Sequence, residues 1–190
     1  MGSWRYVFNP KYELIVNKRK ILFIVVLGVI SLISYLGYSV ITKATEKNEI
    51  AKNLQTIPKF ELRTLDSISF TNQNLKPKTP TVFIYFNSEC DYCHHEAESI
   101  SQNLNSFKNV QFIFVSTEKI ETIKQFSKKY KLHNQPNITF LYDNDYLFTR
   151  NFNANSIPYI LIYNKENNLI KKQSGQLNAN GILRVLNKND

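Results

Sequence analysis

The pattern of apolar and polar residues divides this chain of 190 residues into two unequal parts. Residues 21–41 form one run of 21 residues without a charged side chain, and charged residues flank the run on both sides. At 1.5 Å per residue, a helix of this length covers about 30 Å, which matches the hydrocarbon core of a bilayer. The run therefore predicts one transmembrane helix, which we place at residues 21–42.

The charges on the two sides of this run predict its orientation. The first 20 residues contain five basic residues and one acidic residue, whereas basic and acidic residues nearly cancel just after the run. By the positive-inside rule, residues 1–20 form a cytoplasmic stub and the chain after the span is exported. The protein would then cross the inner membrane once and carry a periplasmic or other extracytoplasmic domain. A cleaved signal peptide is the alternative, but its apolar core is usually shorter, and residues 39–44 lack a clear pair of small residues before a cleavage point.

Beyond the span, the pattern changes to that of a folded domain. Residues 43–57 are polar with a few apolar positions at helical spacing, which predicts a juxtamembrane linker, either a short helix or a tether. In residues 58–190, strand-like apolar runs alternate with helical patterns, and a hairpin and a helix come last. This order predicts an α/β fold with a mixed sheet covered on both faces. The clearest helical stripe comprises Cys93, Ala97, Ile100, Leu104 and Phe107.

The two cysteines of the chain, Cys90 and Cys93, are its most informative chemical feature. A strand-like run at residues 82–86 precedes them and the helical stripe follows, a context typical of a redox-active Cys-x-x-Cys pair. A disulfide bond between them closes too small a loop to constrain the unfolded chain much, so a purely structural role is a poor explanation. We expect Cys93 to face the core and Cys90 to lie near the helix start, where backbone N–H groups favour an anion.

These residues resemble the thioredoxin superfamily, and within it the membrane-anchored TlpA-like thiol–disulfide oxidoreductases. The resemblance covers the exported domain and rests on the strand at 82–86, the helix start at Cys90 and Cys93, and the proline that opens a later strand. The chain departs from the family pattern at Glu89, where Trp is usual, and at Ser99, where proline is frequent. The resemblance implies a thioredoxin-like three-layer fold with a central mixed sheet, no cofactor, and a protein thiol or disulfide as substrate.

The expected chemistry gives each candidate residue a role. Cys90 would attack a substrate disulfide, and Cys93 would then resolve the mixed disulfide. Glu96 matches an acidic residue of the TlpA-like branch and would take the proton from the resolving thiol. Pro158 resembles the cis-proline of the superfamily, which leaves the backbone of Ile157 free to pair with an extended substrate.

Charges around the first cysteine bear on the direction of electron flow. Glu89 and Asp91 flank Cys90 and oppose negative charge on its sulfur, although His94 and His95 offset them if they are protonated. This balance favours a reductant over a strong oxidant. A reductant also needs an upstream electron donor, which we expect in the membrane. The net charge of +9 is spread without a dense basic block, so we expect no nucleic-acid partner.

Two other chemistries fit the same cysteines. Cys90, Cys93 and a histidine could hold copper, as in a metal carrier with a thioredoxin fold. Cys90 to His94 also spells the attachment motif of a c-type haem, with His94 as the proximal ligand. Haem motifs normally lie in small helical domains, whereas this one follows a strand, and copper carriers related to thioredoxins usually space their cysteines one residue wider. We therefore prefer a thiol–disulfide oxidoreductase to either alternative.

Overall fold

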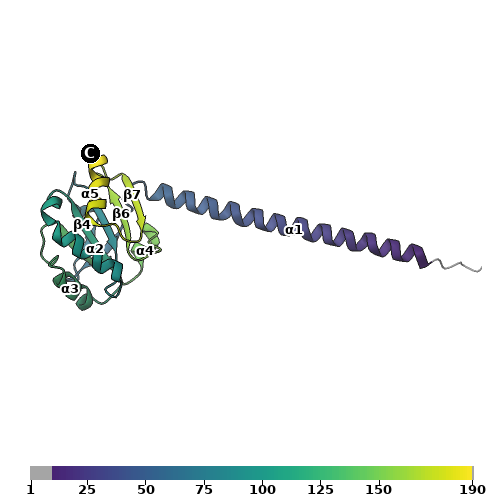
Figure 1. The fold of residues 1–190 in the computed structure, drawn as a ribbon, viewed down its shortest axis with the longest axis horizontal. Coiled ribbons are helices and arrows are strands. Elements are labelled where there is room, and N and C mark those ends of the chain that lie inside the picture. The colour runs from purple at the N-terminus through teal and green to yellow at the C-terminus, as the bar shows by residue number, and fades with distance from the viewer. Residues whose placement is uncertain (1–9, 190) are drawn as a thin grey trace, which may run out of the picture. The chain divides into compact units, whose positions relative to one another are not determined.

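A computed structural model describes the chain from residue 10 to residue 189. The chain divides into two parts, one that ends at Glu49 and a compact part from Ile50 onwards. Helix α1 (Pro10–Asn53) makes up the described portion of the first part, and its last residues belong to the second (Figure 1). Residues 1–9, which are nearly half of the predicted cytoplasmic stub at residues 1–20, lie outside the described residues.

Helix α1 contains the predicted span. Its segment Lys20–Thr42, 23 residues with a mean hydropathy of 2.4, is long and apolar enough to cross a membrane. The large apolar side chains along this segment are exposed, which suits contact with lipid. The prediction of one N-terminal apolar helix that can span a bilayer is therefore confirmed, while its use as a membrane anchor stays a prediction.

Packing of the compact part starts within the predicted linker at residues 43–57. Helix α1 continues to Asn53, and the side chain of Leu54 is only 1% exposed. Ile50 and Ile57 pack against the same apolar core as Leu54. The apolar positions of the linker thus have partners within the compact part, and the backbone of Thr56 forms a β-bridge with Asn168.

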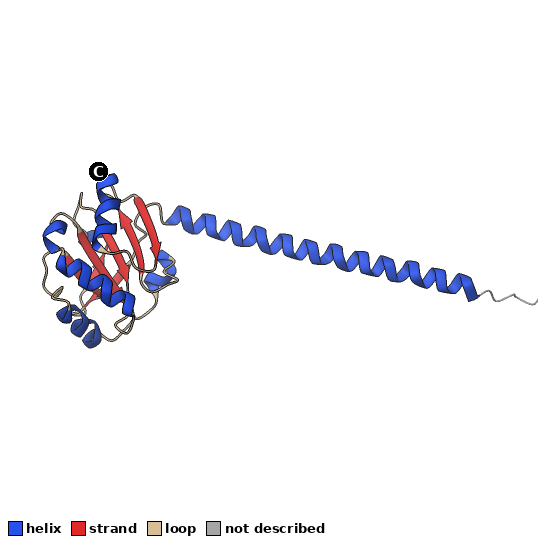
Figure 2. Ribbon diagram, in the orientation of Figure 1, coloured by secondary structure: helices blue, strands red, loops and turns tan. Residues whose placement is uncertain are grey.

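The compact part is built on a seven-stranded mixed sheet with the strand order β2-β1-β5-β4-β3-β6-β7. Strands β3, β4 and β5 are parallel, and the other strands join their neighbours in antiparallel pairs (Figure 2). The strands are β1 (Glu61–Thr64), β2 (Ser69–Thr71), β3 (Thr81–Tyr85), β4 (Gln111–Ser116), β5 (Ile138–Tyr142), β6 (Tyr159–Tyr163) and β7 (Leu169–Ser174). The helices that follow α1 are α2 (Asp91–Gln102), α3 (Ile120–Lys129), α4 (Leu147–Phe152) and α5 (Ala179–Lys188).

Alternation along the central strands creates two apolar cores. Every residue of β3, β4 and β6 is buried, which explains their nearly continuous apolar sequences. On β3, Val82 and Ile84 face the core that packs against α2, α3 and α5, whereas Phe83 and Tyr85 face the core that packs against α4. The sheet therefore has helices on both faces, and the predicted α/β fold in three layers is confirmed.

The helix after the cysteines is shorter than its stripe predicts. The stripe extends through Phe107, but α2 ends at Gln102, and a 3₁₀ helix (Leu104–Phe107) follows it. The side-chain amide of Asn103 donates to the carbonyl of Ser99 at 2.8 Å and so competes with a further helical turn. Phe107 still reaches the core through the 3₁₀ turn, which is why the apolar spacing continues past the end of the helix.

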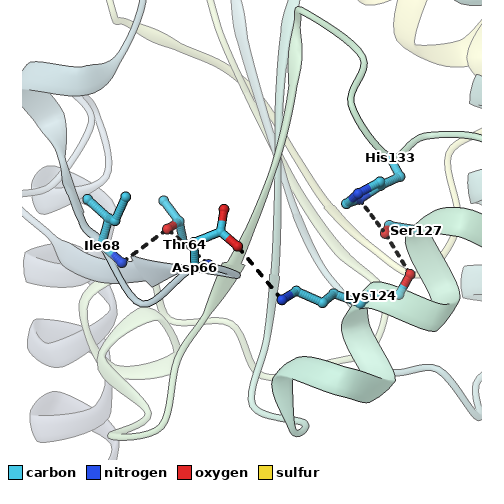
Figure 3. A network of polar contacts seen from close by, with 6 residues as sticks. All are labelled: Thr64, Asp66, Ile68, Lys124, Ser127 and His133. Carbon is cyan, nitrogen blue, oxygen red and sulfur yellow. Dashed lines mark hydrogen bonds and ion pairs between the residues drawn. The ribbon is translucent and has the colours of Figure 1, made fainter.

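Polar contacts connect the β1–β2 turn with α3, and α3 with the loop that follows it (Figure 3). The Asp66 carboxylate lies 3.7 Å from the Lys124 ammonium group, in an ion pair whose aspartate side chain is 80% exposed. The hydroxyl of Ser127 donates to the carbonyl of Lys124 at 2.8 Å and lies 3.3 Å from Nδ1 of His133. An ion pair this exposed adds little stability.

Phe83 is the position where we expect the core to be most sensitive. Its side chain is fully buried. Its ring centroid lies 5.1–5.9 Å from the rings of Phe60, Phe148, Phe152 and Tyr163. Phe83→Ala should lower the free energy of unfolding by about 3–5 kcal/mol, measured by denaturant titration of the detergent-solubilised chain. As a control, Ile68→Ala at a side chain that is 65% exposed should change it by less than about 0.5 kcal/mol. Equal losses in the two variants would contradict the core assignment.

Candidate functional site

The strand directions bring the candidate residues to one edge of the sheet. Cys90 follows the carboxyl end of β3, and Pro158 precedes the start of β6. Because β3 and β6 are antiparallel, with Tyr85 opposite Tyr159, these two points lie side by side. The sulfur of Cys90 lies 3.8 Å from the carbonyl oxygen of Ile157, within reach of a weak S–H···O hydrogen bond.

Cys90 is the N-cap residue of α2. Its backbone is extended, with φ −88° and ψ 114°, and its carbonyl accepts the N–H groups of Cys93 and His94 at 2.9 and 3.1 Å. The Cys90 side chain makes no capping hydrogen bond, so its sulfur is available beside the free N–H groups of the first turn. Cys90 is half-buried, whereas Cys93 is only 2% exposed, and both are free thiols.

Burial determines the acidity of the second thiol. Removal from water raises the pKa of Cys93 far above its ordinary value, and the nearby Cys90 and Glu96 raise it further. A hydrogen bond from the backbone of Asn87 to this sulfur acts in the opposite direction but is outweighed. Cys93 is therefore a protonated thiol at neutral pH and needs a proton acceptor before it can attack a disulfide.

Glu96 is a buried carboxyl group in the second turn of α2. Its side chain is fully buried, and its Oε2 accepts the N–H of Leu177 at 3.4 Å. Its other oxygen, Oε1, has no hydrogen-bond partner. Burial raises the pKa of Glu96 to about 8, although the bond from Leu177 lowers it in part. Glu96 can thus exchange a proton near neutral pH.

The turn before β6 has the backbone form that the resemblance implies. The Ile157–Pro158 peptide bond is cis. The carbonyl of Pro158 accepts the N–H of Gly175 at 2.9 Å, and Gly175 has a φ of 85°, where a side chain would be strained. The side chain of Ile157 is 44% exposed beside Cys90. This edge therefore offers an exposed apolar side chain next to the half-buried thiol.

The histidines near the cysteines have other neighbours. Nδ1 of His94 lies 2.6 Å from the hydroxyl of Tyr130, and its ring packs against Phe126 on α3. His95 is exposed. Between residues 10 and 189, no group of three or more His, Cys, Asp or Glu side chains is arranged to hold a metal ion. The haem-like motif follows a buried strand of a mixed sheet.

Sequence reasoning missed Glu118, which lies just after β4. Its carboxylate accepts hydrogen bonds from the N–H and the hydroxyl of Ser88 at 2.7 and 2.5 Å. The hydroxyl of Ser116 lies 3.2 Å from the same carboxylate. A signal was available, because the carboxyl ends of neighbouring parallel strands meet at one edge, and an acidic residue there lies beside the loop that carries Cys90.

Comparison with known proteins agrees with this geometry. A family model described as the AhpC/TSA family matches residues 54–173. No curated protein sequence matches the chain at a significant level. Among solved structures, MTB DsbF in its mixed oxidized and reduced forms matches with a TM-score of 0.60 and 23% identity, over 72% of this chain and 96% of that one.

Two further structures carry the same fold. A secreted Mycobacterium tuberculosis disulfide oxidoreductase, homologous to E. coli DsbE, matches with a TM-score of 0.56 and 23% identity, over 70% of this chain and 96% of that one. A thioredoxin-like protein from Aeropyrum pernix matches with a TM-score of 0.57 and 18% identity, over 78% of this chain and 98% of that one. These likenesses confirm the predicted thioredoxin-like fold.

The matched segment contains every candidate residue of the site. Cys90, Cys93, Glu96, Ile157 and Pro158 all lie within residues 54–173, and this segment is more than half of the chain. The sequence match, the mixed sheet and the cysteine pair at the start of α2 agree with one another. The chain belongs to the AhpC/TSA family.

Proposed function

We propose that this protein is a membrane-anchored extracytoplasmic thiol–disulfide oxidoreductase that works as a reductant. Family membership and fold support thiol–disulfide oxidoreductase activity in general, with protein thiols or disulfides as substrates. One observation carries the finer proposal: a half-buried Cys90 at the N-cap of α2 precedes a buried Cys93 by three residues. Only the first of these thiols is open to another protein.

The reaction follows from this difference in access. The Cys90 thiolate attacks one sulfur of a substrate disulfide, forms the mixed disulfide and expels the other substrate sulfur as a thiolate. Cys93 then loses its proton and attacks the Cys90 sulfur, which releases the second substrate thiol. The substrate gains two electrons and two protons, and Cys90 and Cys93 end as a disulfide. An upstream dithiol donor in the membrane returns the pair to its reduced form by the same exchange.

Glu96 is the proposed acceptor of the Cys93 proton. Both residues are buried on α2, and the negative charge of Glu96 acts on the Cys93 thiol. Its unpartnered Oε1 can accept a proton without breaking the bond to Leu177. A carboxyl group with a pKa of about 8 is a far stronger base than an ordinary glutamate, so it suits this step.

Ile157 and Pro158 are the proposed substrate contact. The carbonyl of Ile157 lies 3.8 Å from the Cys90 sulfur, so a chain that pairs with this backbone brings its own sulfur to the nucleophile. The exposed side chain of Ile157 adds apolar contact. Pro158 has no N–H group, and it turns the chain into β6 beside the cysteines.

The segment Lys20–Thr42 is the proposed anchor. Its length and hydropathy suit one crossing of the inner membrane. The basic residues before it favour a cytoplasmic N-terminus, so the compact part would lie in the periplasm or another extracytoplasmic space. An oxidising compartment would give a reductant disulfide substrates to act on.

The proposed direction rests on the charges beside Cys90. Strong oxidants of this fold stabilise the reduced, thiolate form of their cysteines. Glu89 and Asp91 flank Cys90, and neither carboxylate favours a negative charge on its sulfur. A pair whose thiolate is not stabilised gives up its electrons more readily, which supports a reductant.

Cys93→Ser should accumulate mixed disulfides with exported proteins, because Cys90 can still attack but nothing resolves the bond. Cys90→Ser, the matched control, should trap few or none, since Cys93 is buried. The species would be detected by non-reducing electrophoresis and identified after release with a reducing agent. Equal trapping by both variants would contradict the assignment of nucleophile and resolving thiol.

The same experiment tests the location. The trapped complexes should stay with membranes after a carbonate wash, because Lys20–Thr42 would hold them there. A soluble form that starts near residue 44 would contradict an uncleaved anchor. Partners that are cytoplasmic proteins would contradict the proposed orientation.

The resolving step should depend on pH through Glu96. Its rate should rise with pH and level off above about 8, because only the deprotonated carboxylate accepts the thiol proton. Glu96→Gln should slow the step by about tenfold or more and remove this inflection. Glu98→Gln, on an exposed residue of the same helix, should leave the profile unchanged. The rates would be measured by stopped-flow with a chromogenic disulfide.

Stability provides an independent check of the same group. The folded pKa of Glu96 lies above its ordinary value of 4.5, so between these values the folded chain binds more protons than the unfolded chain. Stability due to this group is therefore lost as pH rises from about 4.5 to about 8, by roughly 1.4 kcal/mol per pH unit at most. Glu96→Gln should remove this fall, and parallel curves for both proteins would contradict the raised pKa.

The reduction potential of the Cys90 and Cys93 pair should be low. We expect a value near that of thioredoxin, about −270 mV, rather than that of DsbA, about −120 mV. Equilibration of the purified chain with glutathione or dithiothreitol redox buffers measures it. A value near the DsbA end would leave the exchange chemistry in place but reverse the proposed direction.

A further inference from the structure

The loop between β3 and α2 is tied to the end of β4 by one carboxylate. The half-buried Glu118 accepts the Ser88 N–H at Oε2 and the Ser88 hydroxyl at Oε1, at 2.7 and 2.5 Å. Oε2 also accepts the Ser116 hydroxyl at 3.2 Å. Glu118 thus holds both polar donors of Ser88, and hydrogen bonds to a charged acceptor are stronger than neutral ones.

The rest of this loop is fixed at only a few points. The Phe86 N–H donates to the carbonyl of Val115 at 3.0 Å and extends the β3–β4 pairing by one residue. The Asn87 side chain accepts the Glu89 N–H at 2.8 Å, and the Asn87 carbonyl accepts the Cys90 N–H at 3.3 Å. These last two bonds are internal to the loop. Beyond Phe86, the hydrogen bonds of Glu118 to Ser88 therefore connect this loop to the end of β4.

Both sulfurs depend on the path of this loop. Cys90 comes two residues after Ser88, and its position as N-cap fixes where its sulfur meets the Ile157 carbonyl. Asn87 comes one residue before Ser88, and its backbone hydrogen bond acts on the Cys93 sulfur. If the loop moved at Ser88, the Cys90 sulfur would shift. The Asn87 hydrogen bond to the Cys93 sulfur would shift as well.

We propose that Glu118 is a positioning residue of the redox site, a clamp that holds the loop of Cys90 against β4 and so keeps the two cysteine sulfurs in attack geometry. This inference rests on the proposed exchange reaction of Cys90 and Cys93. The clamp would affect the intramolecular attack of Cys93 on the Cys90 sulfur, because the rate of this step depends on the orientation of the two sulfurs.

Two substitutions separate position from charge. Glu118→Ala removes every contact with Ser88. Glu118→Gln removes the charge but can keep both contacts, because its oxygen accepts the Ser88 N–H and its amide donates to the Ser88 hydroxyl. If Glu118 acted only through its charge, the two variants would behave alike, and both would ease the formation of a thiolate at the site.

The experiment uses the full chain, reduced and solubilised in detergent, mixed with 5,5′-dithiobis(2-nitrobenzoate) in a stopped-flow spectrometer. Cys90 attacks this disulfide and releases one thionitrobenzoate. Cys93 then attacks the Cys90 sulfur and releases the second, which leaves the Cys90–Cys93 disulfide and two protons in solution. The second phase therefore reports the intramolecular step alone.

Glu118→Ala should slow the second phase by about tenfold, whereas Glu118→Gln should stay within about twofold of wild type. Glu121→Ala, at an exposed carboxylate in the first turn of α3, should match wild type. Ser88→Ala, which loses the hydroxyl contact but keeps the N–H contact, should slow the phase by about threefold. Ser88→Ala also tests the clamp if Glu118→Ala does not fold.

Equal rates in Glu118→Ala and Glu118→Gln, whether slow or fast, would overturn the clamp. An unchanged second phase in Glu118→Ala and Ser88→Ala would overturn it too. In these cases wild type still releases two thionitrobenzoates, so the proposed function stands. A wild-type chain that releases only one would instead overturn the exchange reaction itself.

Discussion

The pairing of β3 with β4 on one side and with β6 on the other determines where the reactive residues meet. Because β3 and β4 are parallel, Cys90 and Glu118 emerge at the same edge of the sheet. Because β6 is antiparallel to β3, Ile157 and Pro158 enter at that edge too. The alternation within β3 also places its side chains in both apolar cores. The site therefore takes its geometry from three fully buried strands at the centre of the sheet.

The candidate residues at this edge differ in their burial. Cys90 and Ile157 remain accessible, whereas Cys93 and Glu96 belong to the buried face of α2. Burial makes the Cys93 thiol hard to ionise and makes the Glu96 carboxyl a stronger base, so the same loss of solvent acts on both groups of the proposed proton transfer. The buried face of α2 thus holds titratable groups as well as the apolar side chains that pack against the sheet.

Much of this arrangement can be predicted from the sequence. Apolar runs reveal the central strands and the N-terminal helix that is long enough to span a membrane, because both have strong compositional patterns. The cysteine spacing and the strand before it reveal the reactive pair. The end of α2 at Gln102 does not follow from its stripe, since the stripe continues through the 3₁₀ turn to Phe107. Glu118 is also missed, because its partner Ser88 is 30 residues away and only the parallel pairing of β3 with β4 brings the two together.

The contacts of α2 with the segment after β7 explain how the fold tolerates a buried acid. Glu96 accepts the Leu177 N–H and Ser99 accepts the Ala179 N–H, so α2 satisfies one donor just before α5 and one in its first residue. A pKa of about 8 keeps Glu96 mostly neutral at pH 7, which lowers the cost of its burial. The same segment begins with Gly175, whose N–H donates to Pro158. Glu96 and the turn at Pro158 are therefore supported by one stretch of backbone, and Ser99 provides one of its attachments.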